Sequence, residues 1–261
     1  MDYNFENLIK LIEAETGFKC HSYKERPLTR RIRVRMRALG FGEFSQYYDY
    51  LIKNPEEFKL LLDTITINLS YFFRNLETFE YLQEEIIPQL SKNEKIIIWS
   101  AGCAQGEEPY SLAIIAAESG VIDKTKIYAT DIDNNALEKA KQGLYPEITF
   151  QYTPKKYLGK YFTRCGNDYQ INESIKSVVH FIHHDLFEPF PYGPCDLIMC
   201  RNVLIYMSRS AQSIILHRFY ENLKIGGYLV IGKVELLLGI PEAKYFEIIN
   251  RSERIYQKVR N

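Results

Sequence analysis

Long apolar runs are missing from this 261-residue sequence. No stretch approaches the roughly 20 consecutive apolar residues that a helix needs to span a bilayer. The first helix-like stretch, residues 2–16, carries acidic residues along its length and has neither a basic start nor a cleavage site. We therefore expect neither a signal peptide nor insertion into a membrane.

A cysteine framework is missing as well. The cysteines are five, an odd number, and no two of them form a C-x-x-C pair; they are Cys20, Cys103, Cys165, Cys195 and Cys200. This pattern is typical of reduced thiols in the cytoplasm rather than of a disulfide-stapled secreted protein. We expect a cytoplasmic protein.

Net charge is absent, because 33 Lys and Arg balance 33 Asp and Glu. We therefore expect no attraction of the whole protein to nucleic acid. The charge is unevenly spread, however, since residues 24–37 hold seven basic residues and one acidic residue. On a helix, Arg30, Arg33 and Arg37 share one face, which suits an anionic partner, although a solvated face is the usual fate of such a run.

Two kinds of periodicity divide the chain. In its first part apolar residues recur at helical spacing, as in residues 28–39, and glycines follow the helices. Later, short apolar strands alternate with helices, which predicts a parallel, doubly wound α/β sheet. We place the boundary near Arg74, with a helical domain at residues 1–74 and a Rossmann-like domain at residues 75–261.

An interruption separates the strands between residues 143 and 177. Aromatic residues crowd there, and C-G-N-D at residues 165–168 is a turn signal. The gap is too long for a plain crossover loop, so we expect a small inserted β-subdomain with a hairpin at about residues 145–177.

Two glycines lie between a predicted strand and a predicted helix, in I-I-I-W-S-A-G-C-A-Q-G-E-E-P-Y-S. Gly102 and Gly106 would let the backbone approach a ligand at the carboxyl end of the strand. Their G-x-x-x-G spacing differs from the dinucleotide G-x-G-x-x-G, and Glu107 and Glu108 would repel a pyrophosphate. Both acids suit a ligand with a sulfonium and an ammonium group. The pattern is stronger evidence against a nicotinamide cofactor than it is for methyl transfer.

Acidic residues follow two further predicted strands. Asp131, after K-I-Y-A-T, is placed to accept hydrogen bonds from two ribose hydroxyls, whereas an N-cap role fits Asp133 or Asn134 better. Asp185 could accept from an adenine amino group or serve only in a turn.

Three histidines lie close together, at His180, His183 and His184. Strand alternation points His183 away from the other two, so we expect no metal site.

Five motifs resemble the CheR family of chemotaxis-receptor glutamate methyltransferases, and the match covers nearly the whole chain. They are R-R-I-R-V-R-M-R-A-L-G (30–40), N-L-S-Y-F-F-R (68–74), W-S-A-G-C-A-Q-G-E-E-P-Y-S (99–111), A-T-D-I-D (129–133) and C-D-L-I-M-C-R-N-V-L-I-Y (195–206). The resemblance implies an all-α N-terminal domain, then a Rossmann-like S-adenosylmethionine-dependent methyltransferase domain with an inserted β-subdomain. It also implies a monomeric enzyme without a metal, which methylates glutamates in the cytoplasmic helical domain of chemotaxis receptors and releases S-adenosylhomocysteine.

By position, the family's site residues are spread through both predicted domains. The cofactor contacts fall on Asn68, Ser70, Arg74, Glu108, Asp131, Asp185, Leu186, Arg201 and Asn202, to which the glycine turn adds Gly102. The catalytic neighbourhood falls on Arg74 and Tyr206. The chain departs from the family pattern at Gln105, where Thr is frequent, and at Lys233-Val234, where His-Ser is frequent.

The implied reaction needs no general base, because a glutamate with a pKa near about 4.3 is already ionised in the cytosol. Alignment and exclusion of water would then carry catalysis. The fork of Arg74 matches the incoming carboxylate, and Tyr206 can donate its hydroxyl to it. A surface salt bridge for Arg74 and simple packing for Tyr206 are the alternatives.

Two other functions stay open. One is a methyltransferase for a small molecule or nucleic acid, and the other is a binding module without turnover, which Gln105 and Lys233-Val234 would favour. We expect the basic helix to dock the receptor. The predicted hairpin has one glycine, Gly166, fewer than relatives whose hairpins grip a peptide at the receptor's C-terminus, so we expect docking without such a tether peptide.

Overall fold

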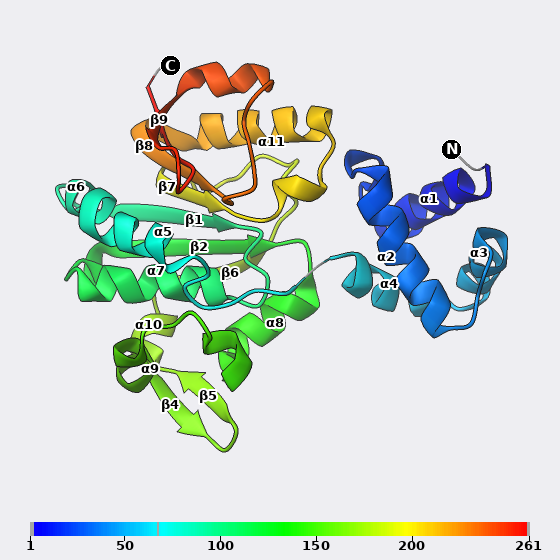
Figure 1. Ribbon diagram of the computed structural model, residues 1–261, viewed down its shortest axis with the longest axis horizontal. Helices are drawn as coiled ribbons and strands as arrows, with labels where there is room; N and C mark the ends of the chain where they lie inside the picture. Colours follow the sequence, from blue (N-terminus) through cyan, green and yellow to red (C-terminus); the bar gives the residue numbers. More distant parts are fainter. Residues whose placement is uncertain (1–2, 67, 260–261) are drawn as a thin grey trace. The chain divides into compact units, whose positions relative to one another are not determined.

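The computed structural model describes residues 3–66 and 68–259 and divides into two compact units (Figure 1). The first comprises residues 3–66 together with Tyr206–Gln212, and the second comprises the rest of the described chain. The division falls before Asn68, whereas we expected the boundary near Arg74. No helix in the described ranges is both long and apolar enough to cross a membrane.

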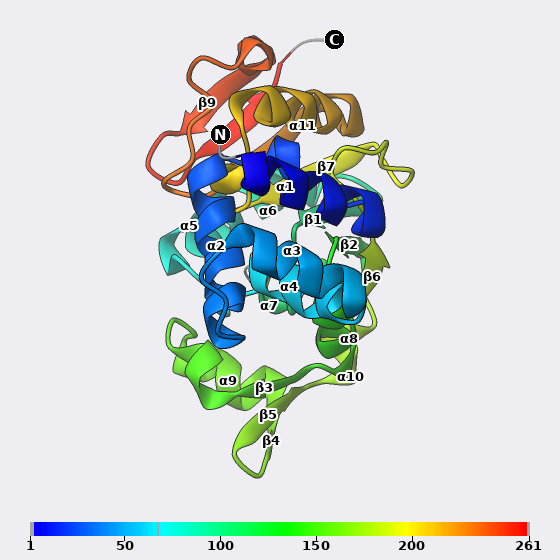
Figure 2. The ribbon, with the colours of Figure 1, turned by 90° about the vertical axis from the view of Figure 1, so that its right-hand side faces the viewer.

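The first unit is helical, and Figure 2 faces its helices. Its helices are α1 (Tyr3–Thr16), α2 (Glu25–Ala38), α3 (Phe44–Lys53) and α4 (Glu57–Ile65). Gly17, at φ +70°, ends α1, because its N–H reaches back to the carbonyl of Glu13 at 2.9 Å. The apolar positions that recur at helical spacing are buried together in one core that includes Leu8, Ile32 and Leu51.

A short segment distant in sequence completes this unit. The backbone N–H of Lys24 donates to the carbonyl of Tyr206 at 2.8 Å, and that of Ser208 donates to the carbonyl of Ser22 at 2.8 Å. Residues 206–208 therefore pair with the chain that enters α2.

The second unit is built on a seven-stranded sheet in the order β6-β2-β1-β7-β8-β10-β9. Its strands are β1 (Ile96–Ala101), β2 (Thr125–Asp131), β6 (Val179–His183), β7 (Cys195–Cys200), β8 (Leu223–Ile231), β9 (Phe246–Asn250) and β10 (Ile255–Lys258). The first five strands of that order pair in parallel, as expected of a doubly wound sheet. The antiparallel edge formed by β10 and β9 was not expected.

Helices connect and flank these strands (Figure 1). They are α5 (Leu76–Tyr81), a π-helix (Leu82–Ile86), α6 (Ile87–Leu90), α7 (Glu107–Glu118), α8 (Asn134–Gln142) and α11 (Arg209–Asn222). β1 lies beside both β2 and β7, so the loops that follow these three strands meet at one edge of the sheet.

The interruption in the alternation is a small antiparallel sheet, as predicted. It consists of β3 (Leu144–Pro146), β5 (Asp168–Ile171) and β4 (Phe162–Cys165), in that order, with α9 (Lys155–Tyr161) and α10 (Glu173–Lys176). Cys165 pairs with Asp168 across a turn in which Gly166 has φ +67°. Figures 1 and 2 show the β4–β5 hairpin projecting from the second unit.

The crowded aromatic residues of this insertion form its core. Phe150 stacks on Phe72 with ring centroids 4.8 Å apart, and Tyr145 meets Phe72 edge-on at 4.8 Å. The subdomain is thus packed against the segment that leads from Asn68 to Arg74, and this packing helps to fix that segment.

Candidate active site

The loop from β1 to α7 depends on glycine at two positions. Gly102 and Gly106 have φ of +79° and +95°, which L-residues with side chains rarely adopt. A Cβ on Gly102 would lie 2.5 Å from Val203 Cγ2, and one on Gly106 would lie 3.0 Å from Ala140 Cβ. No side chain fits at either position, because Val203 and Ala140 already occupy the space, so the loop needs glycine to pack closely against these neighbours.

Asp131 ends β2 beside this loop, and its carboxylate shapes the turn. Oδ2 accepts from the N–H of Ala104 at 2.8 Å, and Oδ1 accepts from the N–H of Asp133 at 3.0 Å. Each oxygen of a carboxylate can accept a further hydrogen bond, so a pair of adjacent hydroxyls can still be bound. Burial raises the pKa of Asp131.

Asp133, not Asp131, is the N-cap of α8, as the sequence indicated. Its Oδ1 accepts from the N–H groups of Asn135 at 2.8 Å and Ala136 at 3.1 Å. Its Oδ2 accepts from Asn68 Nδ2 at 2.7 Å. This bond brings Asn68, a predicted cofactor contact, to the end of β2.

Two buried glutamates begin α7. Glu107 is 2% exposed, and its Oε2 has no hydrogen-bond partner among the described residues. Burial raises its pKa to about 7, and a hydrogen bond from Ser70, a predicted cofactor contact, partly opposes that rise. Our candidate residues did not include Glu107, although its place in the E-E pair was visible in the sequence.

Glu108, whose side chain is 12% exposed, lies among polar and charged partners. Its Oε1 accepts from Ser100 Oγ at 2.8 Å, and its Oε2 lies 4.0 Å from Arg201 Nη1. Burial raises the pKa of Glu108 to about 7, and the Arg201 guanidinium partly opposes the rise. A nearby cationic ligand would lower the pKa of both carboxyls and so restore their ionised form.

Arg201 follows β7 and fastens the loop that carries Arg74. Nη1 donates to the carbonyl of Arg74 at 2.8 Å, and Nη2 donates to Asn75 Oδ1 at 2.5 Å. Its Nε is buried without a hydrogen-bond partner among the described residues. Its expected contact with the cofactor stays a prediction, whereas its bond to this loop is a role that we did not foresee.

Glu235 was also missed, although G-K-V-E marked it in the sequence. Its Oε2 accepts from the N–H groups of Gly232 at 2.5 Å and Asn202 at 3.1 Å, and its Oε1 accepts from Ile205 at 3.1 Å. It is 3% exposed, and burial raises its pKa. Asn202, at φ +61°, is held in its turn by this carboxylate.

Arg74 lines a hollow of about 770 Å³ in the second unit together with Tyr152, Asn202, Lys233 and Val234. Within the described chain, the Arg74 guanidinium makes no hydrogen bond or ion pair. The ammonium group of Lys233, by contrast, forms ion pairs with Glu77 at 3.2 Å and with Glu253 at 3.1 Å. The predicted role of Arg74 as the carboxylate holder stays a prediction.

Three other candidate residues are placed without a test of their roles. Asp185 follows β6, and its Oδ1 accepts from the N–H of Phe187 at 3.0 Å in a turn, while Leu186 is buried. Tyr206 ends a short 3-10 helix (Leu204–Tyr206), is half-buried and falls in the first unit.

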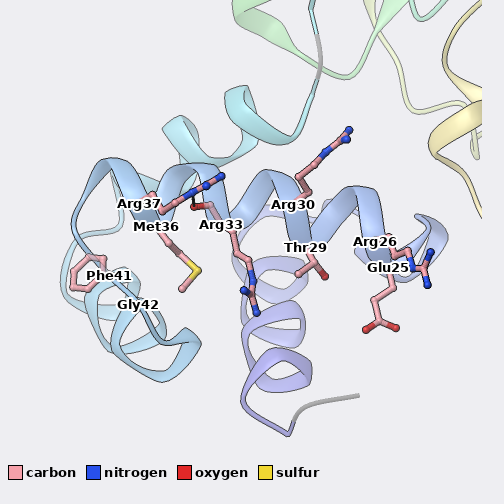
Figure 3. Close-up of a pocket in the computed structure, with 9 residues that line it drawn as sticks. All are labelled: Glu25, Arg26, Thr29, Arg30, Arg33, Met36, Arg37, Phe41 and Gly42. Carbon is pink, nitrogen blue, oxygen red and sulfur yellow. Dashed lines mark hydrogen bonds between the residues drawn. The ribbon is translucent and has the colours of Figure 1, made fainter.

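Five of the six arginines of α2 fall into two groups. Arg30, Arg33 and Arg37, with Arg26, line a surface hollow of about 560 Å³ (Figure 3). Arg35 belongs elsewhere, because its Nη2 donates to the buried Glu57 at 2.7 Å. The predicted docking residues therefore line one hollow. Arg26, which we did not predict from the sequence, lines it as well.

Comparison with known proteins identifies the family. The model of the CheR methyltransferase all-alpha domain matches residues 4–66, and the model of the CheR methyltransferase SAM binding domain matches residues 68–255. The chain belongs to the CheR methyltransferase family. The predicted fold, an all-α domain followed by an S-adenosylmethionine-dependent methyltransferase domain, is confirmed.

Relatives of similar length support the assignment to the CheR family. The chain is 35% identical to the chemotaxis protein methyltransferase of Borreliella burgdorferi over 91% of this chain and 89% of that protein. It is 33% identical to the chemotaxis protein methyltransferase of Salmonella typhimurium, over 90% of this chain and 84% of that one. A solved magnesium protoporphyrin IX methyltransferase from Synechocystis with bound S-adenosylmethionine gives a TM-score of 0.43 at 15% identity, over 71% and 79% of the two chains, a likeness too low to carry an argument.

The residues of this CheR-family site fit S-adenosylmethionine. Asp131 keeps accepting capacity for a ribose diol, and Glu107 has a buried oxygen without a hydrogen-bond partner among the described residues. Two adjacent carboxyls, that of Glu107 buried and that of Glu108 only 12% exposed, suit a cationic nucleoside rather than a phosphate group.

Proposed function

We propose that this protein transfers a methyl group from S-adenosylmethionine to glutamate side chains of chemotaxis receptors, giving glutamate methyl esters. The observation that carries the proposal is Arg74, which lines a hollow and whose side chain makes no hydrogen bond or ion pair among the described residues. A planar fork of donors matches a carboxylate in two parallel hydrogen bonds. The names of the relatives, each a chemotaxis protein methyltransferase, support methyl transfer in chemotaxis.

The chain's own residues would bind, orient and shield the reactants. Asp131 would accept from the ribose hydroxyls, and Glu107 and Glu108 would neutralise the ligand's positive charge. Arg74 would hold the incoming glutamate, whose carboxylate needs no base because its pKa of about 4.3 leaves it ionised. When bound, S-adenosylmethionine supplies a methyl carbon that the carboxylate oxygen attacks as the bond to sulfur breaks.

Positioning of Arg74 would come from its neighbours. Arg201 binds the carbonyl of Arg74 and the side chain of Asn75, and Phe73 donates its N–H to Ser111 Oγ at 3.0 Å. Phe73 and Asn75 both have positive φ, a strained conformation that persists only where surrounding contacts enforce it. A fixed guanidinium reduces the entropy lost when the carboxylate is aligned.

Docking to the receptor would use the hollow on α2. Its four arginines are directed to the surface (Figure 3), and a receptor helix rich in glutamate would supply the opposite charge. We further propose that the protein acts as a monomer in the cytoplasm and needs no nucleic acid.

Labelled S-adenosylmethionine and receptor cytoplasmic fragments test the proposal. We expect label that is released as methanol by mild base, and loss of that label when the receptor glutamates are changed to glutamine. Arg74→Lys should keep the melting temperature but lose most of the activity, at least about a hundredfold, because an ammonium cannot reproduce the fork.

Two results would contradict this function. Tight cofactor binding without any ester would indicate a binding module, and normal turnover by Arg74→Lys would move the carboxylate contact elsewhere.

A further inference from the structure

The loop after β8 exposes apolar side chains in alternation. Val234 is 71% exposed, Leu236 is 46% exposed and Leu238 is 79% exposed, whereas Glu235 and Leu237 between them are buried. Isolated exposed apolar residues are ordinary, but three within five positions of one loop form a patch that interaction sites typically show.

Hydrogen bonds hold this loop in place, so its exposed apolar side chains stay at the surface. Glu235 accepts from the N–H groups of Gly232 and Asn202, and the N–H of Ile240 donates to the carbonyl of Leu237 at 3.1 Å. The carbonyl of Lys233 accepts from Arg254 Nε at 3.2 Å. The buried residues of the loop anchor it, and the exposed ones remain directed to solvent.

The patch is continuous with the hollow that contains Arg74. Val234 lines that hollow, and so does Tyr152, which is 47% exposed. Arg74, whose side chain makes no ion pair in the described chain, therefore lines the same hollow as an exposed valine and an exposed tyrosine, beside the Lys233–Glu77 pair. This combination suits an acidic side chain that arrives with apolar neighbours.

An amphipathic helix presents that combination. Residues three, four and seven positions from a glutamate share its face of the helix, so apolar residues there would accompany the glutamate to the enzyme. A glutamate on a wholly polar helix would leave Val234 and Leu238 in water.

We propose that Val234 and Leu238 form a specificity surface for the apolar face of a substrate helix whose glutamate enters the Arg74 hollow. This inference rests on the proposed function and adds a requirement to it: the methyl-accepting glutamate has apolar residues three or four positions away and seven positions away. Arg74 recognises the acid, and the loop recognises what surrounds it.

The test compares Val234→Ser, Leu238→Ser and the double variant with the unchanged protein. Val234 is largely exposed, so the fold should accept serine at this position. Ile225→Ser is the matched control, because Ile225 is also apolar and exposed but lies in β8 rather than in this loop. We measure KM and kcat for a receptor cytoplasmic fragment and its affinity by calorimetry.

We expect each single variant to raise KM and the dissociation constant about five- to tenfold, as loss of one buried aliphatic side chain would, with kcat within about twofold. The unchanged protein should show the same rise with a fragment whose apolar residues beside the glutamate are replaced by serine. Combining the variant with that fragment should add little, because both changes remove one contact.

Unchanged KM and affinity in the double variant would overturn the inference. So would sedimentation showing that the unchanged protein dimerises and that the double variant does not, because a second copy would then cover the patch. Failure of the proposed function is recognised separately, as absence of ester with the unchanged protein, and the calorimetric titration would still test the surface.

Discussion

The side chains that define the site gain their properties from burial and from backbone partners. Asp131 and Glu235 each bind N–H groups of a neighbouring loop, and Glu107 and Glu108 lie side by side at the start of α7. A buried carboxyl favours its protonated form unless a positive charge or a donor restores the ionised form. Single substitutions at this scale therefore separate ligand contacts from structural ones.

Asp131→Ala should weaken binding of S-adenosylmethionine by about 2–3 kcal/mol, since two hydrogen bonds to ribose would be lost. Calorimetry measures the dissociation constant, and thermal melting without ligand shows how far the loss of the Ala104 and Asp133 bonds disturbs the fold. Asp123→Ala, an exposed acid near the other end of β2, is the control. A dissociation constant equal to that of the control would remove Asp131 from the cofactor site.

Glu107→Gln should change how stability depends on pH. The pKa of Glu107 is raised to about 7 in the folded protein from 4.5, so the folded state keeps a proton that the unfolded state has released. The stabilisation is complete below pH 4.5 and is lost as the pH rises towards 7, at up to about 1.4 kcal/mol per pH unit for one group. The free energy of unfolding, measured with urea across this pH range, should decline less steeply with rising pH for Glu107→Gln than for the unchanged protein.

Glu147 is exposed, and Glu147→Gln is the control for the slope of unfolding free energy against pH. If the slopes of the unchanged protein, Glu107→Gln and Glu147→Gln coincide, the raised pKa of Glu107 is wrong.

At the scale of elements, α2 shows how one run of charge serves two purposes. Arg35 is directed inward to Glu57, whose Oε1 also accepts from Tyr47 Oη at 3.0 Å, and this joins α2, α3 and α4. The arginines at the hollow are spread along the exposed side of the helix (Figure 3). Helical periodicity alone decides which arginines belong to which group.

Changing Arg30, Arg33 and Arg37 together to Glu should lower kcat/KM for a receptor fragment about tenfold or more and leave cofactor affinity unchanged. Added salt should weaken methylation by the unchanged protein in the same direction, because screening acts on the same contacts. Lys92, Lys95 and Lys126 changed to Glu reverse as much charge at the amino-terminal edge of the sheet and serve as control. Equal activity of both triple variants would leave α2 as a solvated face.

At the scale of the whole molecule, the inserted subdomain bears on how the receptor is held. Its order β3-β5-β4 leaves β4 at an edge, where a peptide strand could add, but β4 is only four residues long and its turn has one glycine. We predict that a peptide from the receptor's C-terminus is not needed. Calorimetry should give no binding at micromolar concentrations, and receptors without this tail should be methylated within about twofold of the normal rate.

Micromolar binding of the tail peptide, or a rate that falls about tenfold when the tail is removed, would contradict this prediction. A peptide of the same composition in scrambled order is the control, because main-chain pairing with an edge strand depends partly on alternate side chains.

The sequence by itself determined the local features of this protein. Periodicity predicted the helices of the first unit, the glycine spacing predicted the turn after β1, and C-G-N-D predicted the hairpin at Cys165–Asp168. Asp133 as the N-cap of α8 followed from its position before an amphipathic stretch. Each of these depends on residues near one another in the chain, so the pattern and its structural consequence occupy the same window.

Only the tertiary structure decided which distant groups share the site. Asn68 reaches Asp133, Arg201 binds the carbonyl of Arg74, and Glu235 binds the N–H of Asn202. Two of these bonds end on a backbone group, which every residue type offers, so the partner leaves no mark in the sequence. The antiparallel β9–β10 edge was missed for a related reason, because pairing at the edge of a sheet depends on the strand already in place rather than on local pattern.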